Sequence, residues 1–494
     1  MTPTMSRTLL STGPAVAAPA APLLPRLARN FSAQIVARLA STLVQAGALV
    51  LVARTLGPSR YGLFAVVVTL TVMVSVIAEW GLPMIAGRTI AVGRRGRDEV
   101  LAAVLGLRLA LAIVASVAVV GLAFLASDSG DVRLGALIAS LSFLPQAWLG
   151  SAQIQAQLEL RLERVAWATL GAALSGAAWM LGVVALGGGI PALSVGLLVS
   201  AMASAVVGVV LTPGGIPLRP RGPWELWREL MRDATPLAVA FVLVAVYLYV
   251  GLGLLARLST PAQVGLYDAA FRFMFLGVLL PSAVMSSIYA YAAAQAVKDS
   301  ARFALLGREL LSLIALLVPL PLIVLSADPG GLMTLLYGEA YAAGGEILRV
   351  LGAAVALAIV SGIVGPLIIA LGHERATLWI GACAAVASIS LNLVLIPALD
   401  GVGAAIVTVT TELLVVVPAL VLLIRRGSVR IDGKQMTRVT LAGGAAFAAA
   451  LGVATVGGVI AVVTMGVVVY VLLLFCTGAV DRGRLELIRS PTAR

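Results

Sequence analysis

The chain has 494 residues, of which 61% are hydrophobic and 11% are charged, and its formal net charge is +12. A soluble globular protein carries about 25% charged residues, so this composition excludes a water-soluble fold and makes lipid the solvent. The basic residues lie in short clusters between apolar runs, which favours membrane topology over nucleic-acid binding as the reason for the positive charge.

Residues 1–30 are rich in Ala and Pro and lack a compact apolar core followed by a cleavage site. We expect them to form a cytoplasmic tail and not a signal peptide. Beyond them, apolar runs long enough to cross about 30 Å of hydrocarbon recur along the chain. They predict fourteen spans, at 32–53, 63–87, 100–126, 134–158, 165–187, 190–211, 235–256, 264–294, 307–327, 346–371, 376–397, 401–424, 438–457 and 459–479.

The Arg and Lys residues between the spans are unevenly distributed. Cytoplasmic loops of membrane proteins carry an excess of Arg and Lys. If the N-terminus is cytoplasmic, the outer loops hold only Arg54, Arg60, Arg133 and Arg257, and the other clusters face the cytoplasm. We therefore predict an even number of spans in a bacterial inner membrane, with both termini cytoplasmic.

Two segments that join an outgoing span to a returning one repeat the same pattern. Residues 53–66 read ARTLGPSRYGLFAV and residues 256–269 read ARLSTPAQVGLYDA, with identical Ala, Arg, Pro, Gly and Leu positions at an offset of about 203 residues. Six spans fit each repeat, and both repeats run in the same direction. Parallel repeats are typical of transporters that handle their substrate between the two halves.

The longest inner loop, at 212–233, separates the two repeats. Leu226, Trp227 and Leu230 lie there among charged residues, a pattern that predicts an amphipathic helix on the membrane surface. A similar segment at 332–341 is expected at the outer interface. The predicted organisation is a tail at 1–30, a six-helix bundle at 31–211, this cytoplasmic linker at 212–233, a six-helix bundle at 234–425, two further spans within 426–480 and a tail at 481–494.

Several stretches resemble the polysaccharide-biosynthesis transporters, oligosaccharide flippases of the multidrug/oligosaccharidyl-lipid/polysaccharide exporter superfamily. They are Arg54-Thr-Leu-Gly-Pro-Ser-Arg-Tyr-Gly-Leu-Phe-Ala, Glu79-Trp-Gly-Leu, Val264-Gly-Leu-Tyr, and the region from Leu371-Gly-His-Glu-Arg to Gly401-Val-Gly-Ala-Ala. The resemblance spans residues 30–425. It implies an all-α polytopic membrane protein in which two six-helix parallel repeats surround a central cavity, with two added C-terminal helices.

The resemblance also implies a function. Members of this transporter family move undecaprenyl-linked sugars from the cytoplasmic to the outer leaflet by alternating access. The expected partners are therefore a lipid-linked oligosaccharide, membrane lipids and the glycan polymerase machinery. Neither the two cysteines, Cys383 and Cys476, nor the single His373 has the spacing of a metal site, so we expect no metal and no cofactor.

Three predicted spans carry polar side chains on one helical face. Such stripes either line a wetted cavity or form hydrogen bonds that hold the bundle together, and the two Arg residues among them favour the cavity. The stripes are Gln34, Arg38, Ser41 and Gln45 in the first span, Ser142, Gln146, Gln153 and Gln157 in the fourth, and Asp268, Arg272, Ser282 and Ser286 in the eighth.

The charges inside the spans are absent from the equivalent position of the other repeat, so we assign them to function and not to the shared scaffold. Arg38 and Glu79 lie at a similar depth and are expected to pair, as are Asp268 and Arg272 at a spacing of four residues. The predicted substrate-binding residues are Arg38, Arg272, Gln34, Gln45, Gln146 and Gln153. The predicted gating or coupling residues are Glu79, Asp268 and Glu412.

Two remaining Arg side chains, Arg88 and Arg108, lie near the inner ends of spans, where they are expected to reach lipid headgroups. An ion pair between Arg38 and Glu79 has two interpretations that the sequence leaves open. It either neutralises two costly charges or forms a gate at which an anionic phosphate competes for Arg38. Glu412 is isolated in the twelfth span, where proton coupling and a hydrogen bond within the bundle are both open.

The favoured function is a flippase for a lipid-linked oligosaccharide, because a pyrophosphate needs fixed cations and Arg binds phosphate in a bidentate manner. A multidrug extruder of the same superfamily would favour an acidic, aromatic cavity, and a lipid II flippase would carry a cluster of several Arg residues. A membrane-embedded glycosyltransferase needs a large loop with paired carboxylates, which the chain lacks. We therefore expect no enzymatic activity.

Overall fold

The computed structural model describes residues 23–93, 95–159, 162–212, 219–427, 429, 432–454 and 457–479. Within these residues the regular elements are all helices, which confirms the predicted all-α fold. In chain order they are α1 (Leu23–Glu79), α2 (Leu82–Ala91), α3 (Arg97–Ala126), α4 (Gly130–Ser140), α5 (Phe143–Leu158), α6 (Leu162–Ala185), α7 (Ile190–Val210), α8 (Trp224–Leu258), α9 (Pro261–Phe271), α10 (Phe273–Lys298), α11 (Ser300–Leu317), α12 (Pro319–Ser326), α13 (Pro329–Tyr337), the 3-10 turn η1 (Glu339–Tyr341), α14 (Gly344–Ala370), α15 (Glu374–Arg426), α16 (Gly433–Ala454) and α17 (Val459–Cys476).

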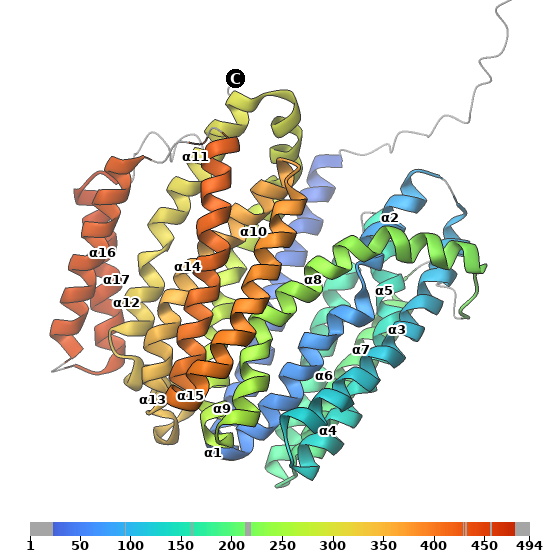
Figure 1. Cartoon of the computed structure of the whole chain (residues 1–494), viewed down its shortest axis with the longest axis horizontal. Coiled ribbons are helices and arrows are strands. Elements are labelled where there is room, and N and C mark those ends of the chain that lie inside the picture. Colours follow the sequence, from blue (N-terminus) through green and yellow to red (C-terminus); the bar gives the residue numbers. More distant parts are fainter. Residues whose placement is uncertain are drawn as a thin grey trace, which may run out of the picture.

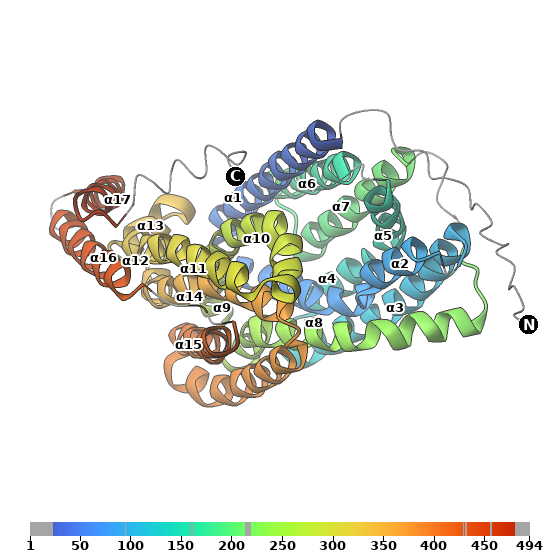
Figure 2. The ribbon, with the colours of Figure 1, turned by 90° about the horizontal axis from the view of Figure 1, so that it is seen from above.

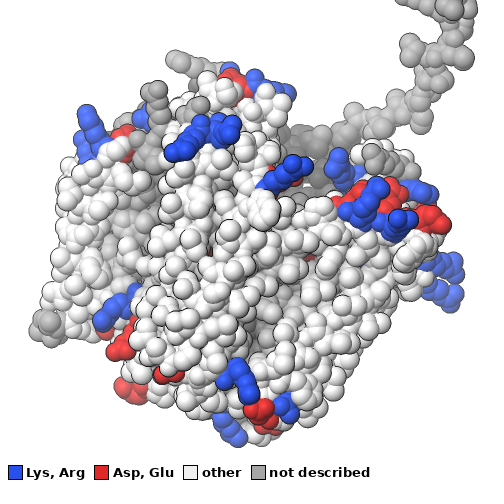
Figure 3. All heavy atoms as spheres, viewed as in Figure 1, with Lys and Arg blue, Asp and Glu red and all other residues white. Residues whose placement is uncertain are grey.

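The described residues contain twelve helical segments that are long and apolar enough to cross a membrane. Two of them hold two crossings each, because α1 turns back at Gly57 (φ 71°) and α15 turns back at Asp400 (φ 47°). With both double helices counted twice, the structure has the fourteen predicted crossings. Figure 3 shows charged side chains gathered at the two ends of the molecule, with an uncharged band between them.

The two repeats form two bundles. Seen from above, α1 to α7 lie on one side, α9 to α15 lie on the other, and α16 and α17 flank the second bundle beyond α12 (Figure 2). We call the end with the Gly57 and Asp400 turns the outer face, and the end with α2 and the start of α8 the inner face (Figure 1). The residue boundaries predicted for the two bundles, the linker and the two further spans remain a prediction.

Apart from α8, which packs on both bundles, the described buried apolar residues of α1–α7 and α9–α15 share a single core, and it includes the outer face. One continuous core contains residues of both bundles, including Phe64 of α1 and Leu266 of α9. Toward the inner face each bundle has its own core, around Leu101 in the first and around Ile363 in the second. The bundles are therefore packed together at the outer face and have separate cores at the inner face.

The predicted linker does not form a separate helix on the membrane surface. Residues from Trp224 onward are the first turns of α8, and Leu226 and Leu230 are buried against Leu82 and Leu101 of the first bundle. The two leucines of this segment therefore pack on protein, whereas Trp224 is 70% exposed. Figure 1 shows α8 running over the first bundle and then bending down between the two bundles.

The second predicted span is broken near its inner end. Trp80 (φ 46°) and Gly81 (φ 68°) both adopt left-handed backbone conformations, and α2 begins directly after them. The hydropathy of 63–87 predicted one continuous helix, but a Gly that favours left-handed φ and the Pro83 that follows it favour a break. The break changes the direction of the chain, so that α2 lies beside α8. Gly81 contacts the Leu237 side chain there.

Candidate functional site

The two repeat segments pack directly against each other at the outer face. A Cβ atom on Gly62 would overlap the carbonyl oxygen of Pro261, and a Cβ atom on Gly265 would overlap the carbonyl oxygen of Pro58. The two contacts are reciprocal, since Gly62 matches Gly265 and Pro58 matches Pro261 in the repeat. A pseudo-twofold axis that relates the two bundles therefore passes through this contact. Glycine has no Cβ atom, so the two backbones can touch there.

One turn further in, a buried polar network crosses the same contact. The Tyr61 hydroxyl of α1 donates a hydrogen bond to Asp268 Oδ2 at 2.7 Å, and Arg272 Nη2 pairs with the same oxygen at 2.7 Å. Arg272 Nε in turn donates to the Tyr61 hydroxyl at 2.7 Å. We call Tyr61, Gly62, Gly265, Asp268 and Arg272 the outer junction. The predicted Asp268–Arg272 pair is confirmed, and a tyrosine of the other bundle completes it.

Two further tyrosines cover the outer junction. The predicted outer surface segment folds inward as α13 and η1, with Tyr337 and Tyr341 only 3% and 0% exposed. The Tyr341 hydroxyl donates to the Ala53 carbonyl at 2.9 Å, and the Tyr337 hydroxyl donates to the Ala269 carbonyl at 3.2 Å. The expectation that this segment lies on the interface is therefore wrong for its tyrosines, because each ring reaches a backbone carbonyl inside the protein.

An exposed ion pair also links the bundles at the outer face. Arg257, at the outer end of α8, contacts Asp128 of the loop after α3 at 2.8 Å, and Arg133 contacts the same carboxylate at 3.2 Å. Such exposed pairs contribute little to stability. The outer face is thus closed mainly by the buried contacts of the outer junction.

The predicted Arg38–Glu79 ion pair is not formed among the described residues. Arg38 lies on the arm of α1 before the Gly57 turn, and Glu79 ends the arm after it. Both side chains are exposed. Glu79 instead lies close enough to Arg108 of α3 to interact electrostatically with it. The prediction failed because equal depth in the membrane does not fix which way two helices face.

Arg108 does not reach outward to lipid headgroups as predicted. It is 4% exposed, and its Nη2 donates to the Gln146 carbonyl of α5 at 3.3 Å. Its guanidinium lies against Gly150, where no side chain stands in the way, and Nε and Nη1 have no hydrogen-bond partner among the described residues. Arg108 is thus a second interior cation, with Glu79 as its neighbouring acid.

The predicted glutamine stripes are only partly described. Gln45 is exposed on α1, as is Arg38. On α5, Gln153 is half-buried and so is Gln146, whose amide donates to Ser142 Oγ at 3.5 Å. The side chain of Gln34 lies outside the described residues. Arg272 belongs to the outer junction, and the binding role of the glutamines stays a prediction.

Glu412 is buried in the second bundle, on the returning arm of α15. Its side chain is near Tyr247 of α8, and Ser361 of α14 lies within hydrogen-bonding reach of its carboxyl group. One carboxyl oxygen, Oε2, has no partner among the described residues. The contact with Ser361 is a hydrogen bond within the bundle, one of the two interpretations that the sequence leaves open, and the role of Glu412 in coupling stays a prediction.

A sequence comparison places this geometry in a family. The profile of the polysaccharide biosynthesis protein family matches residues 27–293, more than half of the chain and all of the outer junction. The chain belongs to this family. The resemblance seen in the Arg54 and Glu79 stretches is thereby confirmed, and no curated protein matches the chain.

Solved structures show which fold this family member has. The lipid II flippase MurJ in an inward closed conformation is similar with a TM-score of 0.76 at 11% identity, covering 92% of this chain and 99% of MurJ. An inward-facing MATE multidrug transporter of the MOP superfamily has a TM-score of 0.58 at 15% identity, covering 80% and 94%. A MOP superfamily transporter from Pyrococcus furiosus, described as having a binding pocket of reverse polarity, has a TM-score of 0.54 at 14% identity, covering 82% and 96%.

These likenesses establish that the family member has the MurJ and MATE fold. Among the described residues, no group of three or more His, Cys, Asp or Glu side chains is placed to hold a metal ion. Tyr61 is the residue that the sequence reasoning missed, although the paired glycines next to it already marked a close contact between the repeats.

Proposed function

We propose that this protein carries a lipid-linked oligosaccharide from the cytoplasmic to the outer leaflet of a bacterial inner membrane by alternating access. The observation that carries the proposal is the asymmetric packing of the bundles. They share one core at the outer face, sealed by the outer junction, and have separate cores at the inner face. This is the arrangement expected of a carrier that is closed to the outside.

The outer junction has the chemistry of a closure that can open. Asp268 and Arg272 lie on neighbouring turns of the same bundle, so their ion pair stays intact when the bundles separate. Only the uncharged Tyr61 hydroxyl leaves with the other bundle. Opening therefore breaks hydrogen bonds but does not strand a buried charge, which would cost about 3–5 kcal/mol.

The interior charges favour an anionic substrate. Arg38 is exposed on α1, and Arg108 lies in the wall between α3 and α5 with two nitrogens unpartnered among the described residues. Arg keeps its charge and binds phosphate oxygens through its planar fork. A pyrophosphate that links a lipid to a sugar fits these groups better than a cationic drug does.

A second candidate is the transport of lipid II. It is favoured by one observation, the TM-score of 0.76 with MurJ, which exceeds those of the two MOP superfamily transporters compared above. The low identity of 11% leaves the substrate to experiment. The two candidates differ in which lipid-linked intermediate accumulates without the protein.

A leaflet-specific assay in a deletion strain tests the proposal. We expect undecaprenyl-linked oligosaccharide to accumulate on the inner leaflet while peptidoglycan synthesis continues. Complementation with the intact gene should remove the accumulated intermediate. Accumulation of lipid II would support the second candidate instead, and normal surface glycan with altered dye efflux would refute both.

A further inference from the structure

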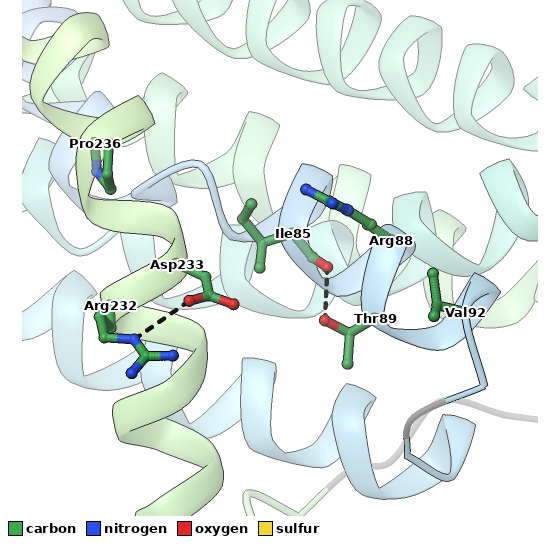
Figure 4. Close-up of a pocket in the computed structure, with 7 residues that line it drawn as sticks. All are labelled: Ile85, Arg88, Thr89, Val92, Arg232, Asp233 and Pro236. Carbon is green, nitrogen blue, oxygen red and sulfur yellow. Dashed lines mark hydrogen bonds and ion pairs between the residues drawn. The ribbon is translucent and has the colours of Figure 1, made fainter.

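A pocket at the inner face lies between α2 and α8. Its volume is about 470 Å³, within the range of cavities that hold small ligands. Figure 4 shows the side chains of the two helices on opposite sides of it. We call it the α2–α8 pocket, and its lining residues are Ile85, Arg88, Thr89, Val92, Arg232, Asp233 and Pro236.

The pocket offers two guanidinium groups with little competition for them. Arg88 has no ion-pair partner among the described residues. Within the part of the chain that the structure describes, Arg232 forms an ion pair only with its neighbour Asp233, at 3.5 Å, with side chains that are 79% and 40% exposed. An exposed pair of this kind is weak, so an anion can replace the carboxylate. The pocket is therefore suited to a group with more negative charge than Asp233 supplies.

The rest of the lining is suited to an amphiphile. Ile85, Val92 and Pro236 supply apolar walls beside the two Arg residues. The pocket lies at the inner end of the second crossing, because Val92 comes just before the basic residues Arg94, Arg95 and Arg97. Basic clusters of this kind flank the ends of membrane spans on the cytoplasmic side. A free anion would gain nothing from the apolar walls, whereas a lipid headgroup would contact both kinds of surface.

We propose that the α2–α8 pocket binds the phosphate-bearing headgroup of a lipid from the inner leaflet, with Arg88 and Arg232 as its ligands. A lipid-linked substrate and an anionic phospholipid carry the same phosphate chemistry. The assignment of the headgroup to the substrate rests on the proposed function. In that case the pocket is where the substrate is held before it enters the space between the bundles.

The test measures binding by isothermal titration to the purified full-length protein in detergent. The probes are farnesyl diphosphate, short-chain phosphatidylglycerol and inorganic pyrophosphate. We expect Arg88→Gln and Arg232→Gln each to weaken farnesyl diphosphate binding about tenfold, the usual loss for a charged hydrogen bond. Asp233→Asn should strengthen binding, because it removes the competing carboxylate.

The matched control is Arg228→Gln, which removes the same charge from an exposed position of α8 that does not line the pocket. It should bind farnesyl diphosphate like the wild type. Unchanged binding by both Arg88→Gln and Arg232→Gln would overturn the proposal, as would equally tight binding of inorganic pyrophosphate. Melting temperatures of the variants separate a lost ligand from a lost fold.

The measurement with phosphatidylglycerol identifies the source of the headgroup. Tighter binding of farnesyl diphosphate than of phosphatidylglycerol supports the substrate, and the reverse order supports a phospholipid at the same site. A failure of the proposed function can be told apart from a failure of the proposed site. If the wild-type protein does not translocate lipid-linked oligosaccharide but the Arg variants still lose binding, the site stands and only the function is refuted.

Discussion

Tyr61 supplies the one hydroxyl of the outer junction that comes from the first bundle. Tyr61→Phe keeps the ring but removes the bonds to Asp268 and Arg272. Hydrogen bonds to charged groups contribute about 1.5–3 kcal/mol, so we expect the equilibrium to shift about tenfold or more toward the outward-open state. Distances between spin labels near the Gly57 turn of α1 and at the start of α9 measure this shift.

Tyr267→Phe is the matched control for this variant. The Tyr267 hydroxyl hydrogen bonds Thr408 at 2.9 Å, so both partners belong to the second bundle. Its loss should lower thermal stability without changing the distance across the outer face. Equal label distances in Tyr61→Phe and the wild type would show that the network does not hold the bundles together.

Arg38 is an exposed cation on the first arm of α1, and its role can be tested alone. We expect Arg38→Ala to abolish transport, because the substrate loses a fixed positive charge, while membrane insertion and yield stay unchanged. Transport in reconstituted vesicles and the amount of protein in membranes give the two readouts. Transport at the wild-type rate would assign Arg38 to packing.

At the residue scale, the predicted pair within one segment is present, whereas the predicted pair between two helices, Arg38 and Glu79, is not formed among the described residues. Asp268 and Arg272 are four residues apart, and their pair is present. Tyr61 is 207 residues from Asp268, so its part in the network depends on how the bundles meet. The burial of Arg108 likewise depends on Gly150 of another helix, which hydropathy does not show.

At the scale of elements, the Gly62 and Gly265 contact is the closest approach of α1 and α9. Gly62→Ala places a methyl group against the Pro261 carbonyl, so we expect the outer face to be forced open or the protein to lose stability. Gly47→Ala is the control, since a Cβ on this glycine of the same helix meets nothing within 4 Å. Labels across the outer face and melting curves distinguish the outcomes.

Gly62→Ala and Gly47→Ala should therefore have different effects on stability. Alanine favours a helix by about 1 kcal/mol over glycine, so Gly47→Ala should leave stability unchanged or raise it. If Gly62→Ala behaved in the same way, with the outer face still closed, the backbone contact would not limit the packing of the two repeats.

The added helices α16 and α17 start from a capped turn at the inner face. Asp432 accepts hydrogen bonds from the backbone N–H groups of Gln435 and Lys434, at 3.2 and 3.1 Å. The bond from Gln435, with smaller contributions from Arg308 and Lys434, lowers the pKa of the Asp432 carboxyl. The carboxylate therefore stabilises the start of α16 when it is ionised.

This cap should make the start of α16 sensitive to acid. Because the pKa of Asp432 is lowered by folding, its stabilisation is complete above the ordinary carboxyl pKa of about 4 and is lost as the pH falls through the folded value. We expect faster amide exchange in the first turn of α16 at low pH. Asp432→Asn still caps the helix but does not titrate, so its exchange should show no such step.

The helices themselves were largely predictable because hydropathy and length decide what crosses a membrane. The breaks inside them were not. Trp80 and Gly81 interrupt the second span, and α8 absorbs the predicted linker because Leu226 and Leu230 find a protein surface. Both features depend on tertiary contacts, which a periodic apolar pattern does not contain.

At the scale of the whole molecule, the charge bias and the repeat predicted the architecture. The fourteen crossings and the contact between residues 53–66 and 256–269 agree with that prediction. The substrate could not be predicted in the same way, because it depends on where Arg38, Arg108 and Arg272 face. Arg272 belongs to the outer junction, so Arg38 and Arg108 remain as candidates for binding phosphate, besides the two Arg residues of the α2–α8 pocket.

The most direct test of the account follows the substrate across a membrane. Purified protein is reconstituted into vesicles that carry undecaprenyl diphosphate-linked oligosaccharide, and a membrane-impermeant glycosidase reports the fraction of sugar exposed outside over time. We expect wild-type protein to bring substrate from the inner leaflet to the enzyme, whereas Arg38→Ala should not. Exposure no faster than in protein-free vesicles would contradict it.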